Sequence, residues 1–524
     1  MALLLDGTNL TIENLVRVAR FDEPVDLAPE ARERLRRCRG FVEDKIAERA
    51  VMYGINTGIG ELSEVVLPPE QMRRFQRYLV YSHAAGCGTP LPIEVVRAAM
   101  CSRINVLGKG HSGIRPLIVD TLIAMLNKGV TPVVFDKGSV GACGDLSPMS
   151  QMAIVLLGEG EAYYRGERMP GAKAMQAAGI PTVEFEARDG LATINGSNMT
   201  AGFGGLLLYD ADRYFRTSEV AVAMTLEVLN ANMAAYDERI HRVRGYPSAI
   251  ICAENVRRLV EDSEMLRQPG KKVQDAYSLR STPQVVGAAK DALRWARYMF
   301  EIELNGVGDN PLFFPEDRMY LTGANFQGTP LGIALDVVGP AVTMVAVLSE
   351  RRTNRLLNRN LSVGLPAFLT KGAGMFSGLM LTQYTQGMLV CEDRILSAPA
   401  SVGSIPAAAD QEDFVSMAFT AALKTKQILD NAWYVVAIEL MAGAQAVEFR
   451  KPLTLGRGTA VAYDTVRRHV AKMEEDRPVQ YDINKLAEVI RSGELLEAVE
   501  REVGRLQSYP AEPFSTGQYG IAGV

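Results

Sequence analysis

Residues 328–352, GTPLGIALDVVGPAVTMVAVLSERR, contain the longest apolar stretch of the 524-residue chain, which runs from about Gly328 to Leu348. Asp336 interrupts the stretch, Pro340 lies inside it, and a charged Glu-Arg-Arg triplet ends it. A membrane span needs about 20 consecutive, predominantly apolar residues. The interruptions and the charged end therefore favour a helix buried in the protein core, and we expect no membrane partner.

Several other segments share this composition, rich in Ala, Leu, Met and Val with few helix breakers. Long helices that are apolar over much of their surface must bury that surface against one another or against other subunits. The predicted fold class is therefore all-α, with a core of long bundled helices. The expected long helices are at about 198–236, 284–304, 330–358, 374–394 and 413–449.

Shorter, more polar helices are expected near both ends of the chain. Thr11 can cap a helix over 11–19, and Pro29 suits the first turn of a charged surface helix over 29–48. The segment 470–507 also has a surface-helix composition.

Loops rich in Gly, Ser, Asn and Pro separate these helices, and functional residues are often held on such loops. We expect a smaller, loop-rich N-terminal region over 1–200, followed over 201–524 by the long-helix bundle and C-terminal helices. The loops are at 53–61, 138–148, 194–198, 307–314, 321–330 and 400–411.

Composition excludes several classes of function. The net charge of -5, without a Lys/Arg-rich run, argues against a nucleic-acid partner. The first residues lack the basic region of a signal peptide. Six scattered cysteines without a CxxC pair indicate a reduced, cytoplasmic protein. His83 and Cys87 stand four residues apart, but no second pair completes a zinc site, so no metal is expected.

The loop KGSVGACGDLSP, residues 137–148, is the most unusual stretch of the sequence. Gly138, Gly141 and Gly144 give it a permissive backbone. A phosphate-binding nest is one interpretation, but the loop lacks the Lys-Ser/Thr ending of a P-loop, and the chain has no GxGxxG motif. A tight turn around a small buried cysteine is another.

Residues 141–148, GACGDLSP, resemble the signature loop of the histidine/phenylalanine/tyrosine ammonia-lyase family, which usually reads Gly-Ala-Ser-Gly-Asp-Leu-x-Pro. Together with further motifs in family order, the resemblance covers roughly residues 5 to 450. The other motifs are Tyr53-Gly-Ile-Asn-Thr-Gly58, Ser82-His-Ala-Ala-Gly86, Ile194-Asn-Gly196, Gln274-Asp-Ala-Tyr-Ser-Leu-Arg280, Asp309-Asn-Pro311, Asn325-Phe326 and Gln411-Glu-Asp413.

The resemblance implies a prosthetic group made from the chain itself. In the family an Ala-Ser-Gly triplet cyclises into 4-methylideneimidazole-5-one (MIO), which would form here from Ala142, Cys143 and Gly144. An electrophile that bonds the substrate amine helps to expel a poor leaving group. Gly144 suits ring closure because its nitrogen must reach the Ala142 carbonyl, and a side chain would obstruct it.

Residue 143 departs from the family pattern, since it is Cys where the family usually has Ser. A thiol can leave by β-elimination as a hydroxyl does, so the same ring is chemically reachable. Two other hypotheses stay open: a MIO-free lyase that keeps an unmodified Cys143, and an inactive homologue.

The resemblance also implies roles for residues far apart in the sequence. Tyr53 corresponds to the catalytic base, and a phenol with a pKa near 10 needs help from nearby cationic or hydrogen-bonding groups to act near neutrality. Arg280 corresponds to the residue that binds the substrate carboxylate, which a guanidinium grips with two hydrogen bonds.

The remaining implied site residues orient the substrate or support the ring. Asn195, Tyr277 and Gln274 resemble family residues that orient the amine and carboxylate and support the MIO oxygen. Phe326 resembles one that packs beside the substrate or the MIO ring. The family assembles its site from several subunits of a homotetramer, which would explain why these residues are dispersed along the chain.

His83 and Glu412 indicate the substrate side chain. In relatives that act on histidine, the corresponding His and Glu face the imidazole, and both would be poorly satisfied against a bare phenyl ring. Phe414 argues against histidine, because histidine-specific relatives typically have His there; Tyr81 and Gln327 are also atypical. The leading prediction is elimination of ammonia from L-histidine to give urocanate. A phenylalanine or tyrosine ammonia-lyase, or a 2,3-aminomutase with the same MIO chemistry, is the alternative.

Overall fold

The computed structural model describes residues 2–510, which form two compact units. Unit 1 comprises the chain up to Tyr209, together with Ala296–Asp336 and Pro399–Leu423. Unit 2 comprises Asp210–Trp295, Val337–Ala398 and the chain from Lys424 onward. The first division lies near the expected boundary at residue 200, but unit 1 also takes in two later segments.

Unit 1 contains short helices and small sheets. Its helices are α1 (Ile12–Arg20), α2 (Pro29–Ala47), η1 (Gly60–Leu62), α3 (Pro69–His83), α4 (Ile93–Leu107), α5 (Pro116–Lys128), α6 (Leu146–Ala153), η2 (Ile154–Leu157), α7 (Gly171–Ala177) and α8 (Asp189–Ile194). Its strands are β1 (Leu3–Leu5), β2 (Val25–Leu27), β3 (Cys87–Pro90), β4 (Thr131–Pro132), β5 (Phe135–Lys137), β6 (Glu161–Tyr164), β7 (Glu167–Pro170), β8 (Leu312–Phe314) and β9 (Met319–Leu321). β1 and β2 pair in parallel, whereas the β3-β5, β4-β6-β7 and β8-β9 sheets are antiparallel.

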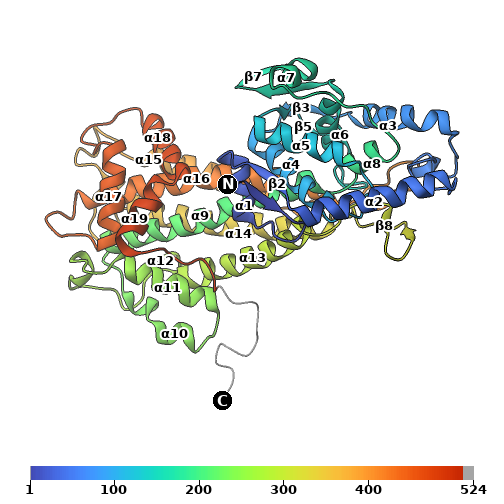
Figure 1. Cartoon of the computed structure of the whole chain (residues 1–524). Helices are drawn as coiled ribbons and strands as arrows, with labels where there is room; N and C mark the ends of the chain where they lie inside the picture. Colours follow the sequence, from blue (N-terminus) through green and yellow to red (C-terminus); the bar gives the residue numbers. More distant parts are fainter. Residues whose placement is uncertain (1, 511–524) are drawn as a thin grey trace. The chain divides into compact units, whose positions relative to one another are not determined.

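Four long helices contribute residues to both units: α9 (Asn198–Val228), α13 (Thr282–Leu304), α14 (Thr329–Leu357) and α16 (Ala418–Val447) (Figure 1). Unit 2 adds η3 (Met233–Tyr236), α10 (Glu238–Arg242), α11 (Pro247–Leu259), η4 (Met265–Arg267), α12 (Tyr277–Arg280), η5 (Ala367–Leu369), α15 (Met380–Leu396), α17 (Arg457–His469), α18 (Gln480–Ser492) and α19 (Glu494–Val503). The predicted all-α class is confirmed.

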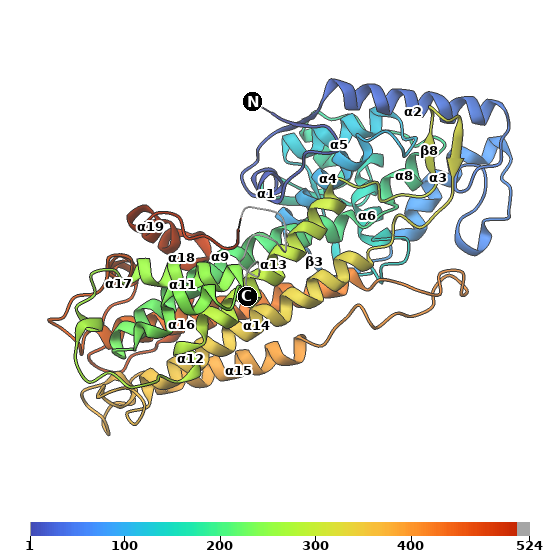
Figure 2. The same ribbon diagram turned by 90° about the horizontal axis from the view of Figure 1, so that it is seen from below.

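In unit 2, α14, α15 and α16 lie side by side (Figure 2). A buried ion pair joins α14 to α16, with Arg352 Nη2 2.8 Å from Glu439 Oε2. From α15, Gln386 Nε2 donates to the Val435 carbonyl of α16 at 2.7 Å. Polar groups buried in this way are partnered, because an unpaired buried charge is costly.

The apolar stretch at 328–348 forms most of α14, and the helix continues through Pro340. Among the described residues α14 is the one helix long and apolar enough to cross a membrane, but 61% of its apolar window is buried in the protein. This burial agrees with the prediction of a core helix.

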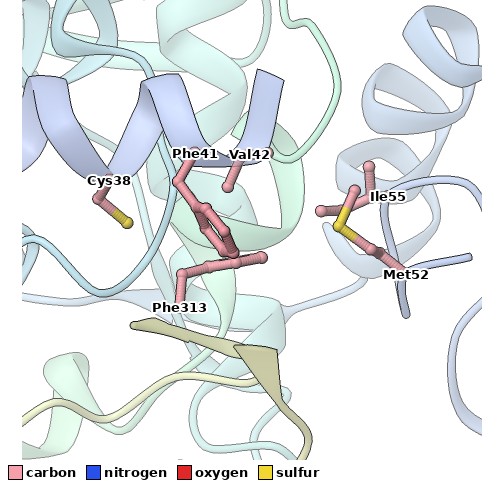
Figure 3. Close-up of a cluster of buried hydrophobic side chains, with 6 residues drawn as sticks. All are labelled: Cys38, Phe41, Val42, Met52, Ile55 and Phe313. Atoms are coloured by element: carbon pink, nitrogen blue, oxygen red, sulfur yellow. The ribbon is translucent and has the colours of Figure 1, made fainter. Parts of the chain in front are cut away.

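A small core in unit 1 supports the loop that carries Tyr53. Phe41 of α2 packs edge-on against Phe313 of β8, with ring centroids 6.5 Å apart, and Met52 and Ile55 are fully buried in the same cluster (Figure 3). Since these two residues flank Tyr53 in the chain, their burial fixes the backbone on both sides of it. The full cluster is Cys38, Phe41, Val42, Met52, Ile55 and Phe313.

Candidate active site

Three loops of unit 1 bring Tyr53, Cys143 and Glu412 together. The Cys143 thiol donates a hydrogen bond to Glu412 Oε1 at 3.1 Å. The Tyr53 hydroxyl accepts the backbone N–H of Gly60 at 3.0 Å. A methyl group added to Gly60 would lie 3.8 Å from Glu412 Oε1. The turn that bonds the tyrosine hydroxyl therefore lies beside the carboxylate. Residues separated by hundreds of positions therefore form one cluster.

The loop around Cys143 is a tight turn with left-handed backbone. Gly141, Cys143 and Gly144 have φ of 84°, 51° and 81°. Left-handed backbone is unfavourable for a residue with a side chain, so Cys143 is held there by its surroundings. Gly196 holds the loop by two backbone hydrogen bonds. Its N–H donates to the Cys143 carbonyl at 3.1 Å, and its carbonyl accepts the Asp145 N–H at 2.9 Å.

Asp145 fixes the other end of this loop. Its buried carboxylate accepts the Thr200 N–H at 2.7 Å and the Ser139 hydroxyl at 3.0 Å. Burial raises the pKa of Asp145 to about 6, while the hydrogen bonds from Thr200 and Ser139 lower it. These contacts tie the loop to the first turn of α9.

Asn195 presents an unpartnered acceptor beside the loop. Its Nδ2 donates to the Asn310 carbonyl at 2.8 Å, whereas its buried Oδ1 has no hydrogen-bond partner among the described residues. The Asn310 carbonyl is itself held by Arg188 at 3.1 Å, and Arg188 pairs with Asp309 at 2.8 Å. The Asp309-Asn-Pro311 motif thus orients Asn195.

The implied MIO group fits this loop. A side chain at Gly144 would overlap the Gly196 carbonyl, so the position requires the glycine that a ring-forming triplet also needs. A turn covers Ala142 and Cys143, two of the three residues that would form the ring. The free Oδ1 of Asn195 adds an acceptor at the adjoining loop.

The surroundings of Tyr53 in unit 1 raise the pKa of its hydroxyl. Burial is the largest cause, and the neighbouring Cys143 and Glu412 raise the pKa further. The Gly60 N–H and the Arg188 charge lower it, without outweighing the burial. These neighbours therefore provide only part of the pKa lowering that a tyrosine base needs.

His83 and Phe326 also lie in unit 1. His83 ends α3, and its Nδ1 hydrogen bonds with the Leu79 carbonyl at 2.7 Å rather than with the Cys143–Glu412 pair. Because a carbonyl can only accept, Nδ1 carries a proton in this contact, and the Ser82 hydroxyl lies 3.0 Å from the same nitrogen. The Phe326 carbonyl accepts the Ser197 hydroxyl at 2.8 Å, which joins its loop to that of Gly196.

Gln274, Tyr277 and Arg280 belong to unit 2. Tyr277 is 72% exposed, and the Arg280 guanidinium lies 4.7 Å from the centroid of its ring. Gln274 and Arg280 line a cavity of about 280 Å³. Arg280 Nε is buried and has no partner among the described residues.

Sequence reasoning missed two supporting contacts. Gly60 bonds the Tyr53 hydroxyl, and the N–H of Met417 donates to the Val140 carbonyl at 3.0 Å, fixing the start of the Cys143 loop. The Gly-Ile-Gly sequence at 58–60 was a usable signal for a tight turn. The second contact uses only the backbone N–H of residue 417. The residue type at that position therefore gives no signal from which the contact could be predicted.

Known proteins resemble this chain over most of its length. The family model for aromatic amino acid lyase matches residues 10–468. Histidine ammonia-lyase of Alkaliphilus oremlandii is 48% identical over 502 residues, which are 96% of this chain and 99% of the relative.

Solved structures also match over nearly the whole chain. Tyrosine aminomutase from Streptomyces globisporus matches with a TM-score of 0.92 and 35% identity, covering 97% of this chain and 100% of that one. Histidine ammonia-lyase from Trypanosoma cruzi matches with a TM-score of 0.90 and 33% identity, covering 99% of each. The resemblance inferred from the motifs is confirmed: the chain belongs to the aromatic amino acid lyase family and is a carbon–nitrogen lyase.

Proposed function

We propose that this lyase eliminates ammonia from an aromatic L-amino acid, with L-histidine, converted to urocanate, as the leading substrate. The observation that carries the proposal is the carboxylate of Glu412, 3.1 Å from the sulfur of Cys143. A carboxylate beside the reactive loop suits an imidazole N–H and would be left unsatisfied by a phenyl ring. The name of the 48% identical relative supports the same substrate.

The family is MIO-dependent, and we propose that Ala142, Cys143 and Gly144 form the group in this chain. When formed, the group supplies an electrophile that bonds the substrate amine and makes it a better leaving group. The left-handed turn at Cys143 and the close packing of Gly144 against Gly196 support this assignment.

The chain's own side chains bind the substrate and move the proton. Tyr53 takes the β-proton as general base. Asn195 accepts a hydrogen bond from the amine through its free Oδ1, and Phe326 packs beside the substrate. Arg280 grips the carboxylate, whereas Tyr277 and Gln274 orient the amino-acid end.

Glu412 and His83 recognise the substrate ring. The Glu412 carboxylate accepts the N–H of the imidazole, and His83, whose Nδ1 bonds the Leu79 carbonyl, uses Nε2 for a hydrogen bond with a substrate ring nitrogen or a phenol hydroxyl. Glu412 therefore discriminates between histidine and phenylalanine more sharply than His83 does.

One observation favours the alternative, a tyrosine or phenylalanine lyase or a 2,3-aminomutase. Phe414 follows the Gln-Glu-Asp motif and is 59% exposed, and one of the matched structures is a tyrosine aminomutase. An aminomutase would return the amine to the β-carbon, so its product would be a β-amino acid.

We further propose a cytoplasmic homotetramer in which several copies complete each site. All six cysteines are free, as in a reducing compartment. Tyr277, a substrate residue in this proposal, is largely exposed in the single chain. On α15 an exposed apolar seam repeats at heptad spacing, a pattern typical of helix–helix contacts. Its members are Leu381, Tyr384, Met388, Cys391 and Ile395.

The test is a substrate panel of L-histidine, L-tyrosine and L-phenylalanine, read by the absorbance of the unsaturated acid and by chromatography of β-amino acids. The proposal predicts urocanate from histidine as the main product. Turnover of tyrosine without histidine, or a β-amino acid as main product, would establish the alternative instead.

A further inference from the structure

The Cys143 sulfur lies against the carboxylate of Glu412. The thiol donates a hydrogen bond to Glu412 Oε1 at 3.1 Å. Burial raises the pKa of the thiol, and the charge and hydrogen bond of Glu412 raise it further. The thiol therefore keeps its proton near neutral pH. Its partner is a group that can accept a proton as a carboxylate and donate one as a carboxylic acid.

Glu412 is presented by a tight hairpin of unit 1. Two backbone hydrogen bonds close the hairpin, from the Ala407 N–H to the Glu412 carbonyl at 2.9 Å and from the Glu412 N–H to the Ala407 carbonyl at 3.1 Å. Between them the backbone is left-handed at Ala408, Ala409 and Asp410, with φ of 49°, 52° and 66°. Left-handed backbone without glycine is unfavourable and persists where its surroundings impose it. The Glu412 side chain therefore reaches the sulfur from a defined backbone position.

Formation of the prosthetic group requires the sulfur of Cys143 to leave. The Cα–H bond and the Cβ–S bond of this residue break, and the electrons of the Cα–H bond form the new double bond between Cα and Cβ. The electrons of the Cβ–S bond leave with the sulfur as hydrosulfide, which keeps the thiol proton. The proton lost from Cα converts hydrosulfide into hydrogen sulfide. The step is balanced without an oxidant or a reductant, but it needs a group that carries this proton.

Two other titratable side chains lie near the loop, but within the described chain neither is hydrogen-bonded to the sulfur. The Asp145 carboxylate accepts a backbone N–H and a hydroxyl at the other end of the loop. The Tyr53 hydroxyl accepts the Gly60 N–H, and burial raises its pKa, so the phenol is largely protonated near neutral pH and is a weak base there. Glu412 is the titratable group in contact with the leaving atom.

We propose that Glu412 also acts in the maturation of the enzyme, as the group that takes the Cα proton of residue 143 and delivers it to the departing sulfur. This inference rests on the proposed function, in which Ala142, Cys143 and Gly144 form the prosthetic group. Glu412 is a carboxylate again once hydrogen sulfide has left. The same side chain then becomes available to the substrate ring.

The experiment follows the mass of the peptide containing residue 143 while the full-length chain is made in a cell-free reaction, so the readout does not depend on turnover. Glu412→Gln keeps the shape of the side chain and an oxygen that accepts from the thiol, but it cannot carry the proton. Glu61→Gln is the matched control, because it removes an exposed carboxylate from η1, next to Gly60. Thermal unfolding of each purified protein tests its fold.

Wild type and Glu61→Gln should lose one water and one hydrogen sulfide at the same rate. In Glu412→Gln the loss of sulfur should slow by about 10²-fold or more, the usual contribution of general acid–base catalysis, so that peptides retaining sulfur accumulate. In a Cys143→Ser background, Glu412→Gln should slow the loss of the hydroxyl even more, because a leaving group of higher pKa departs less readily without a proton.

Loss of sulfur at the wild-type rate in a folded Glu412→Gln protein would overturn the proposal. Equal slowing with either leaving group would also overturn it, because a residue that only shapes the loop gives that result. If Glu412→Gln does not fold, the pair Glu412→Asp and Glu412→Asn repeats the comparison, and equal rates in this pair count against the proposal.

The failure of this proposal is distinguishable from failure of the proposed function. In each of the contradicting results above, the wild-type chain still forms the group, so the proposed function stands. A wild-type peptide of unmodified mass would instead contradict formation of the group from Ala142, Cys143 and Gly144, and the role of Glu412 in maturation with it.

Discussion

Tyr53 is a half-buried phenol whose hydroxyl accepts a backbone N–H and lies in the cluster with Cys143 and Glu412. Replacing it with Phe removes the proposed base but keeps the ring that fills the same space. We expect turnover to fall by about 10²- to 10⁴-fold, the usual contribution of general base catalysis, with unchanged thermal unfolding. Tyr81→Phe removes a hydroxyl outside the proposed machinery and serves as the control. Near wild-type turnover in Tyr53→Phe would remove Tyr53 from the role.

The pH dependence follows from the direction of the Tyr53 pKa. A general base acts in its deprotonated form, and burial raises the pKa of this phenol. The active fraction therefore grows as the pH rises toward that pKa. We predict that kcat/KM increases between about pH 7 and 9 in the wild-type enzyme. The rise should be absent from the residual activity of Tyr53→Phe, and the same profile in both proteins would contradict the assignment.

Glu412 should discriminate between substrate rings. Glu412→Gln keeps the shape of the side chain but replaces a charged acceptor of the imidazole N–H. We expect kcat/KM for histidine to fall about tenfold more than kcat/KM for phenylalanine, the effect of losing a charged hydrogen bond. Measuring both substrates on one preparation cancels any difference in the content of the prosthetic group. Equal losses for the two substrates would exclude Glu412 as the ring-reading residue.

The Cys143 loop and the turn at Gly196 are two elements that pack backbone to backbone. Gly144→Ala would place a methyl group against the Gly196 carbonyl and force a side chain into left-handed backbone. We predict an unmodified residue 143 and a loss of unfolding free energy above the roughly 1–2 kcal/mol cost of that conformation alone. Peptide mass and denaturant unfolding measure the two effects.

Gly129, the left-handed residue after α5, provides the matched control. It has φ of 76° with no atom within 4 Å of an added Cβ, so Gly129→Ala isolates the conformational cost. A Gly144→Ala protein as stable as this control, with a complete prosthetic group, would contradict the packing argument.

The sequence predicted the type of the long elements better than their ends. The expected helix at 330–358 is α14 within one residue at each end, and Thr11 caps α1 by accepting the Asn14 N–H at 3.2 Å. The helix expected from 374 begins only at Met380, because Gly374 and Gly378 adopt positive φ before it. The helix expected from 413 begins at Ala418, after Met417, which is also left-handed.

The sequence motifs predicted candidate residues for the site but not their geometry. Motifs identified Tyr53, Cys143 and Glu412, whereas the thiol–carboxylate hydrogen bond depends on how distant loops meet. Local sequence does not encode such long-range contacts. The expected help for Tyr53 from cationic or hydrogen-bonding groups is present only in part, because Arg188 and the Gly60 N–H lower its pKa while burial dominates and raises it.

At the scale of the whole molecule, the seam on α15 predicts self-association. Met388 is 60% exposed in the single chain, and a charge in a helix–helix contact would be costly to bury. We expect Met388→Glu to yield smaller species by light scattering and to lose activity with them. Tyr481→Glu, which places the same charge at an exposed apolar residue of α18 rather than α15, should leave both unchanged. A Met388→Glu protein that keeps the wild-type mass would exclude this seam from the interface.

The most direct test of the central claim is the mass of the peptide that contains Cys143, taken from freshly purified wild-type protein. We predict a peptide lighter by one water and one hydrogen sulfide, because ring closure between Ala142 and Gly144 releases the first and loss of the Cys143 sulfur the second. A peptide of unmodified mass with a free thiol would contradict the account. The chain would then be a MIO-free lyase or an inactive member of its family.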